Sequence, residues 1–161
     1  MDILWAPWRM EYIENADKDE GCIFCDKPKE NRDKENLIIH RGEMGFVMMN
    51  KYPYNSGHVM IVPYQHTGEF SSLSREEKME LFNLLISSKD ALTEIMKPQG
   101  FNIGMNLGRI AGAGIVDHLH FHIVPRWSGD TNFMPIISHT KVVSEGLKQT
   151  WEKLKQAFEK Q

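Results

Sequence analysis

The stretch His118-Leu119-His120-Phe121-His122-Ile123-Val124 places three histidines at alternate positions of an otherwise apolar run. Successive side chains of a β-strand point to opposite faces, so this spacing predicts three imidazoles on one face, about 6.7 Å apart, with the apolar side chains turned into a core. One histidine on a strand is usually a satisfied polar residue. Three at this spacing are unfavourable as packing, because each ring brings a polar nitrogen that needs a partner. The pattern favours either metal binding or attack by an imidazole on a phosphate.

The composition of the chain is that of one ordinary globular domain. Its 161 residues are 41% hydrophobic and 25% charged, which suffices for one core but not comfortably for two. The formal net charge of -3 gives no support for binding nucleic acid through general charge attraction. No apolar run approaches the roughly 18 residues that span a membrane, and residues 1–9 do not have the pattern of a signal peptide. We therefore expect a cytoplasmic protein with no membrane or nucleic-acid partner.

The two cysteines of the chain, Cys22 and Cys25, have the spacing Cys-x-x-Cys. A secreted disulfide scaffold would carry more cysteines, so the pair is either half of a metal site or a redox pair. Thioredoxin-like redox pairs lie between a strand and the helix that follows it. Here the pair lies in the turn-rich segment 21–28, with no strong helix pattern after it, and this context favours a metal knuckle.

Hydrophobic periodicity and turn residues predict an α+β domain in which helices pack against an antiparallel sheet. Five strands are expected, at 37–40, 45–50, 58–63, 101–106 and 119–124. The capping-box pattern Ser74-Arg75-Glu76-Glu77 predicts a helix that begins there and ends near Lys97. Apolar positions at helical spacing predict a C-terminal helix within 140–160: Val142, Val143, Leu147, Trp151, Leu154 and Phe158. We expect one domain over 1–161, divided into an N-terminal arm with the knuckle (1–36), a catalytic core (37–133) and the C-terminal helix (140–160).

The run from His118 to Val124 matches the motif His-φ-His-φ-His-φ-φ, where φ is apolar, and the chain resembles the histidine triad (HIT) family of nucleotide hydrolases and transferases. The likeness extends to Asn50, to 56–59, to 63–66 and to the loop 106–114. The segments Trp5-Ala6-Pro7-Trp8-Arg9 and 125–133 resemble the bacterial diadenosine tetraphosphate phosphorylase branch of that family. The resemblance implies a HIT-like fold and a homodimer whose sheets join across a two-fold axis. The aromatic N-terminal arm and the C-terminal helix are candidates for additional interface.

The resemblance also implies a reaction and assigns residues to it. His120 would attack the α-phosphorus of a nucleotide in line, and the covalent nucleotidyl-histidine would be resolved by water or phosphate. The backbone carbonyl of His118 would hold the other nitrogen of His120, and His122 would contact the phosphate or the leaving oxygen. The catalytic candidates are thus His118, His120 and His122. The candidates for nucleotide binding are Asn50, Asn106, Gly112, Gly114, Ile115 and His122, and the glycine-rich loop could supply N–H donors to phosphate.

Gly114 occupies a position where many hydrolases of the family carry glutamine. Its small size opens room for a larger acceptor than water, which favours phosphorolysis of an adenine dinucleoside polyphosphate with inorganic phosphate as the second substrate. Three alternatives stay open: hydrolysis of nucleoside phosphoramidates or other nucleotide conjugates, a metalloenzyme whose three triad histidines bind a catalytic metal, and a nucleotide-binding module without activity. No organic cofactor is expected.

Cys22, Cys25, His66 and one triad histidine could form a tetrahedral zinc site. The resemblance to zinc-bearing members of the wider superfamily selects His118 as the fourth ligand. The site would be structural and would leave His120 to act as the nucleophile. The alternative for His66 is an exposed residue of the loop 65–67 that binds no metal. Arg109 and Arg126 could meet phosphates, but such residues are more often solvated surface charges.

Overall fold

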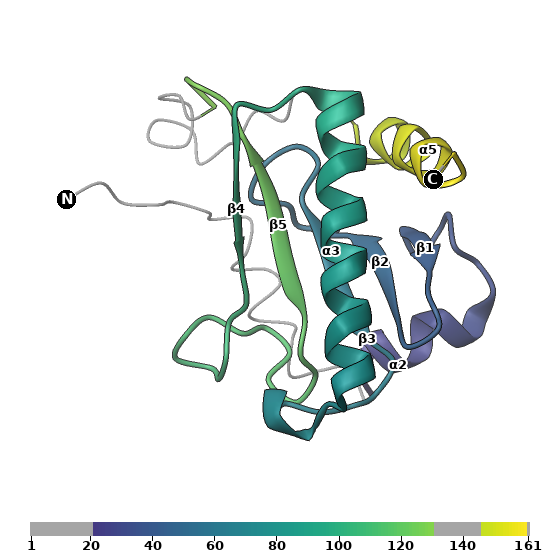
Figure 1. Ribbon diagram of the computed structural model, residues 1–161, viewed down its shortest axis with the longest axis vertical. Coiled ribbons are helices and arrows are strands. Elements are labelled where there is room, and N and C mark those ends of the chain that lie inside the picture. The colour runs from purple at the N-terminus through teal and green to yellow at the C-terminus, as the bar shows by residue number, and fades with distance from the viewer. Residues whose placement is uncertain (1–20, 131–145, 161) are drawn as a thin grey trace.

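Five antiparallel strands form one sheet in the computed structural model of this chain, which describes residues 21–130 and 146–160 (Figure 1). The spatial order is β1 (Ile38–Arg41), β2 (Gly45–Met49), β3 (Val59–Pro63), β5 (Phe121–Arg126) and β4 (Gly100–Gly104). Each neighbouring pair is antiparallel. The predicted α+β class and antiparallel sheet are therefore confirmed, with β1 and β4 at the two edges.

The helices begin and end close to where the sequence predicts. The long helix α3 (Arg75–Met96) starts with the expected capping box: the Ser74 hydroxyl accepts from the Glu77 N–H at 3.1 Å, and the Glu77 carboxylate accepts from the Ser74 N–H at 2.7 Å. It ends where Lys97 takes a left-handed conformation. The C-terminal helix α5 covers Leu147–Phe158, and the predicted Val142 and Val143 lie outside the described residues. Short helices α2 (Ile23–Asp26), η1 (Lys27–Glu30) and η2 (Phe70–Ser72) complete the described elements.

The two faces of the sheet bury different groups of side chains. Helices α3 and α5 cover one face, where Ile61, Ile123, Leu92 and Leu154 are all fully buried. On the other face a smaller apolar cluster forms around Phe24 and side chains of β1, β2 and β3: Ile38, Phe46, Met48, Met60 and Val62. This division follows from the alternation of side chains along a strand. It leaves the second face for the histidines.

The first part of the histidine run is not in a strand, and here the sequence prediction is wrong. Strand β5 begins at Phe121, so His122 lies in it while His118 and His120 precede it. The N–H of Leu119 donates to the carbonyl of Thr67 at 2.8 Å rather than to a neighbouring strand. The three imidazoles therefore do not form an evenly spaced row: the ring centroids of His120 and His122 are 4.8 Å apart, and His118 faces elsewhere.

Candidate functional site

His118 is fully buried and turns both ring nitrogens to defined partners. Its Nε2 lies 2.9 Å from the carbonyl oxygen of Pro63, which can only accept, so Nε2 carries the proton and Nδ1 carries the lone pair. Burial lowers the pKa of His118, which keeps the ring neutral at pH 7. Its Nδ1 lies 3.2 Å from Sγ of Cys22 and 3.5 Å from Sγ of Cys25. This is the tautomer and the setting of a metal ligand.

The four predicted ligands Cys22, Cys25, His66 and His118 meet at one place. Nδ1 of His66 lies 3.2 Å from Nδ1 of His118 and 3.4 Å from Sγ of Cys25, and all four donor atoms lie within 4.8 Å of one another. Donors at tetrahedral angles and 2.0–2.3 Å from one zinc ion would be about 3.3–3.8 Å apart. Cys22 is the N-cap residue of the short helix α2, and Cys25 lies three residues later, within the helix. The chain thus has a possible Cys/His metal site whose donors fit zinc.

His120 has one nitrogen held in the way that the family resemblance implies. Its Nδ1 donates to the backbone carbonyl of His118 at 3.0 Å, so the lone pair of the neutral ring is on Nε2. The ring is 6% exposed and packs against Phe24, with 4.9 Å between ring centroids. Neutral imidazole with its lone pair fixed in direction is a nucleophile that needs no deprotonation.

His122 is held by a histidine that the sequence prediction did not single out. The backbone N–H of Tyr54 donates to Nδ1 of His58 at 3.1 Å, so the proton of the neutral His58 ring is on Nε2. That Nε2 lies 2.9 Å from Nδ1 of His122, which must accept. The proton of His122 is therefore on its Nε2. His58 is fully buried, and its position directly before an apolar strand, where a polar ring is costly, was the available signal.

The triad does not gather around one point. His118 points to the cysteines, while His120 and His122 direct their Nδ1 atoms to the carbonyl of His118 and to His58. Among the described residues, one cluster of side chains could hold a metal ion. It contains His118 with Cys22, Cys25 and His66, and it contains neither His120 nor His122. The arrangement does not support a catalytic metal held by all three triad histidines.

Asn50 directly follows β2, two of whose side chains, Phe46 and Met48, belong to the Phe24 cluster. Asn50 is 8% exposed, and its side-chain oxygen accepts from the N–H of Tyr52 at 2.9 Å. Ile115 packs against the same cluster. Gly114 precedes it in a bend of the chain.

The glycine-rich loop uses part of its backbone internally, contrary to the expectation that its N–H groups serve a ligand. The Gly112 N–H donates to the carbonyl of Arg109 at 3.0 Å, and the Ala113 N–H lies 3.3 Å from the carbonyl of Gly108. Both Gly108 and Gly112 have positive φ, which explains why glycine is required there. The side chain of Asn106 lies 3.4 Å from the Gly112 carbonyl and joins the loop to the end of β4.

A pocket of about 420 Å³ opens next to His122 on the face of the sheet that carries the triad. Two predicted site residues, Asn106 and His122, line it. Arg126, which the sequence offered as a possible phosphate contact, also lines it. The other lining residues were not predicted: Tyr54, Asn55, Asn102, Ile103, Gly104, Met105, Val124 and Asp130. Arg126 is not a freely solvated charge, because Asp130 pairs with its Nε at 2.6 Å.

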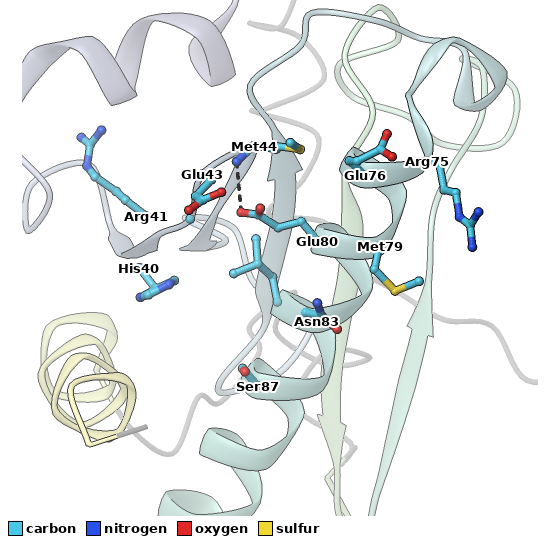
Figure 2. Close-up of a pocket in the computed structure, with 12 residues that line it drawn as sticks. His40, Arg41, Glu43, Met44, Arg75, Glu76, Met79, Glu80, Asn83 and Ser87 are labelled. Carbon is cyan, nitrogen blue, oxygen red and sulfur yellow. Dashed lines mark hydrogen bonds between the residues drawn. The ribbon is translucent and has the colours of Figure 1, made fainter.

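A larger groove of about 890 Å³ lies on the other side of the sheet, between the β1–β2 connection and the first half of α3 (Figure 2). Glu80 reaches across it and accepts from the N–H of Met44 at 3.0 Å. The groove is lined by charged side chains of both signs, among them Arg41, Arg75 and Glu76. None of the predicted catalytic, nucleotide-binding or metal residues lines this groove, so the candidate site is the one around the triad.

The site pairs His120, which lies directly before β5 and has a directed lone pair, with His122, which lies in β5 and has a directed N–H. This arrangement is suited to nucleophilic attack on phosphorus. No helix among the described residues has the length and apolar character needed to cross a membrane.

Comparisons with known proteins agree with this class of site. Residues 31–129 match the HIT domain, and the chain belongs to the HIT family of nucleotide-processing enzymes. It is 37% identical over 155 residues to a Mycobacterium tuberculosis protein named AP-4-A phosphorylase, covering 91% of this chain and 79% of that one. A histidine triad nucleotide-binding protein from Sulfolobus tokodaii has the same fold, with a TM-score of 0.69 and 24% identity, covering 86% of this chain and 93% of that one. A zinc-bound histidine triad protein from Mycobacterium smegmatis also matches, with a TM-score of 0.61, 20% identity and 93% of each chain covered.

Proposed function

We propose that this protein transfers the nucleotidyl group of dinucleoside polyphosphates through a covalent intermediate on His120. The observation that carries the proposal is the pair of fixed tautomers, with the lone pair of His120 and the N–H of His122 both on Nε2 and the two rings 4.8 Å apart. The similarity to a protein named AP-4-A phosphorylase supports diadenosine tetraphosphate as the substrate. Asn50 and Ile115 would contact the nucleoside that stays bound, and Asn106, with the backbone at Gly112 and Gly114, would border its phosphate.

In the first step Nε2 of His120 attacks the α-phosphorus and forms a P–N bond. The P–O bond to the remaining polyphosphate breaks, and the leaving oxygen takes the electron pair. The carbonyl of His118 accepts from Nδ1–H of His120 throughout and stabilises the positive charge that the ring gains. The N–H of His122 donates to the phosphoryl or leaving oxygen. In the second step the acceptor attacks phosphorus opposite the P–N bond, and His120 leaves as neutral imidazole.

The hydrogen-bond chain behind His122 favours phosphate over water as the acceptor. Nδ1 of His122 accepts a hydrogen bond from Nε2–H of His58, and Nδ1 of His58 accepts one from the backbone N–H of Tyr54. This chain holds His122 as a neutral hydrogen-bond donor rather than as a base or a cationic acid. A polyphosphate leaves as a stable anion and phosphate attacks as one, so neither needs a proton from His122. Water must lose a proton, and an amine leaving group must gain one, so hydrolysis and phosphoramidate cleavage are less favoured.

Product analysis tests this proposal. We expect diadenosine tetraphosphate to give ADP and ATP only when inorganic phosphate is present, as separated by anion-exchange chromatography. AMP and ATP in the same amounts with and without phosphate would establish a hydrolase and contradict the argument from His122. Tight binding of the nucleotide without turnover would instead identify a binding module.

We further propose that zinc binds to Cys22, Cys25, His66 and His118. The matching donor distances and the neutral Nδ1 lone pair of His118 support this assignment. The ion would be a structural cross-link with no part in the reaction. It would join α2 to His118, whose carbonyl orients His120.

His66→Ala provides a clean measurement of the zinc site, because His66 is exposed and its ring contributes little packing. We expect wild-type protein to contain one zinc per chain and the variant to contain much less. We also expect the variant to melt about 5–10 °C lower, the shift for about 2–3 kcal/mol in a chain of this length. After chelation, the wild-type protein and the variant should melt at the same temperature. The assignment would be contradicted if purified wild-type protein contains no zinc and melts at the same temperature with and without chelator.

We also propose that the single domain functions as a homodimer. Phe82 and Ile86 of α3 are 52% and 51% exposed, and Ile103 of β4 is 44% exposed. Because β4 is an edge strand of the sheet formed by the described residues, these side chains form an apolar surface at that edge. The apolar side of α5 is not available for this contact, because Leu154 and Phe158 pack inside the same chain. We expect light scattering to give a molar mass in solution equal to that of two chains.

A further inference from the structure

The pocket beside His122 extends away from the triad along β5. Its lining runs from His122 to Arg126, four residues further along the strand, which corresponds to about 13 Å at the rise of a β-strand. Its volume of about 420 Å³ is in the range of small-molecule sites. Because an acceptor or leaving group must lie opposite His120 at the phosphorus, next to His122, this pocket is where the leaving part of a substrate would extend.

The guanidinium of Arg126 is fixed in this pocket by three hydrogen bonds. Nε and Nη2 donate to Asp130 at 2.6 and 3.0 Å, and Nη1 donates to the side-chain oxygen of Asn102 at 2.8 Å. Asp130 is held in turn by the side-chain nitrogen of Asn55 at 2.8 Å. The positive charge is therefore balanced by Asp130, and three of the five guanidinium N–H donors are committed to protein acceptors. The guanidinium is thus held in one orientation and presents its flat face to a ligand, on which a nucleobase can stack.

The rest of the lining is also neutral and suits a planar ligand. The ring of Tyr54 stacks on His58, at 4.8 Å between centroids and 15° between planes, and thereby forms a rigid aromatic wall. The side-chain oxygen of Asn102 accepts from Arg126, and its amide nitrogen can donate to the edge of a base. A chain of phosphates would find no uncompensated cation among the described residues that line the pocket, since Arg126 is its one cationic side chain.

We propose that this pocket binds the base of the second nucleoside, the one that leaves with the polyphosphate. The inference rests on the proposed function and adds a specificity to it: the enzyme recognises both ends of a dinucleoside polyphosphate. The separation of about 13 Å between His122 and Arg126 also selects for a chain of several phosphates, because a single phosphate cannot connect the two.

Adenosine 5′-tetraphosphate provides the test, because it contains the same scissile bond without the second nucleoside. We expect wild-type kcat/KM to be at least about tenfold higher for diadenosine tetraphosphate, the effect of one stacked base. Arg126→Lys keeps a positive charge for Asp130 but lacks the flat face. It should raise KM for the dinucleoside substrate until the two kcat/KM values agree within about twofold, with kcat/KM for adenosine 5′-tetraphosphate unchanged.

Two further variants keep the test decisive. Asn102→Leu, at an exposed position of the edge strand, narrows the pocket and should remove the same preference if Arg126→Lys fails to fold. Asn83→Leu is the matched control, because it makes the same change at an exposed position of α3, in the groove on the other side of the sheet. Equal kcat/KM for the two substrates in the wild type would overturn the inference and leave the proposed function intact. Turnover of neither substrate would overturn the proposed function itself.

Discussion

His120→Asn is expected to lower kcat for diadenosine tetraphosphate by at least about 10⁴-fold. The amide nitrogen of asparagine has no basic lone pair, so it cannot form the P–N bond. Its size and polarity fit the space between Phe24 and His122, whose rings lie 4.9 and 4.8 Å from that of His120. The nucleotide site should therefore survive, and AMP should bind the variant within about threefold of its affinity for the wild type.

Single-turnover kinetics with radiolabelled substrate separates this loss from a loss of fold. Wild-type protein should retain adenylate covalently when phosphate is omitted, and His120→Asn should retain none. His40→Asn is the matched control, because it makes the same change at a half-buried histidine that stacks on Phe158 of α5, on the other side of the sheet. Its kcat should stay within about twofold of the wild type. Turnover by His120→Asn at more than a few per cent of the wild-type rate would exclude a covalent intermediate on this residue.

Local patterns in the sequence were enough for the elements and for two parts of the site. The capping box at Ser74 fixes the start of α3 because both hydrogen bonds join residues three apart. The cysteines and the histidine run were recognised because each is a short motif. The contact from Nδ1 of His120 to the His118 carbonyl spans two residues and follows from the family resemblance.

The parts that could not be predicted depend on contacts between distant segments. His58 and His122 are 64 residues apart, and Asn55 and Asp130 are 75 apart, so no local period joins them. The evenly spaced row of imidazoles failed because strand pairing in β5 begins only at Phe121. The Thr67 carbonyl takes the N–H of Leu119 before that point. The tautomers of His118 and His122 follow from distant partners, the Pro63 carbonyl and His58, so they could be assigned only from the folded chain.

Replacing His58 is expected to have the second-largest effect, through His122. His58→Phe keeps a planar ring but removes the N–H that Nδ1 of His122 accepts at 2.9 Å. His122 can then carry its proton on Nδ1, which turns the N–H away from the leaving oxygen. We expect kcat to fall about 10²–10³-fold, in the range for loss of one oriented donor in a catalytic site, with KM nearly unchanged.

His58→Gln separates tautomer control from a purely structural role, because its amide supplies a donor for His122 and an acceptor for the Tyr54 N–H that lies 3.1 Å from Nδ1 of His58. It should recover at least about tenfold of the lost kcat. Nitrogen NMR of labelled His122 should show the Nε2–H form in the wild type and in His58→Gln, and a mixture in His58→Phe. If both variants melt at the wild-type temperature and lose kcat equally, His58 serves packing and not the tautomer. Rescue by glutamine together with the Nε2–H signal would establish that a buried residue 64 positions away in the chain sets the proton of a catalytic histidine.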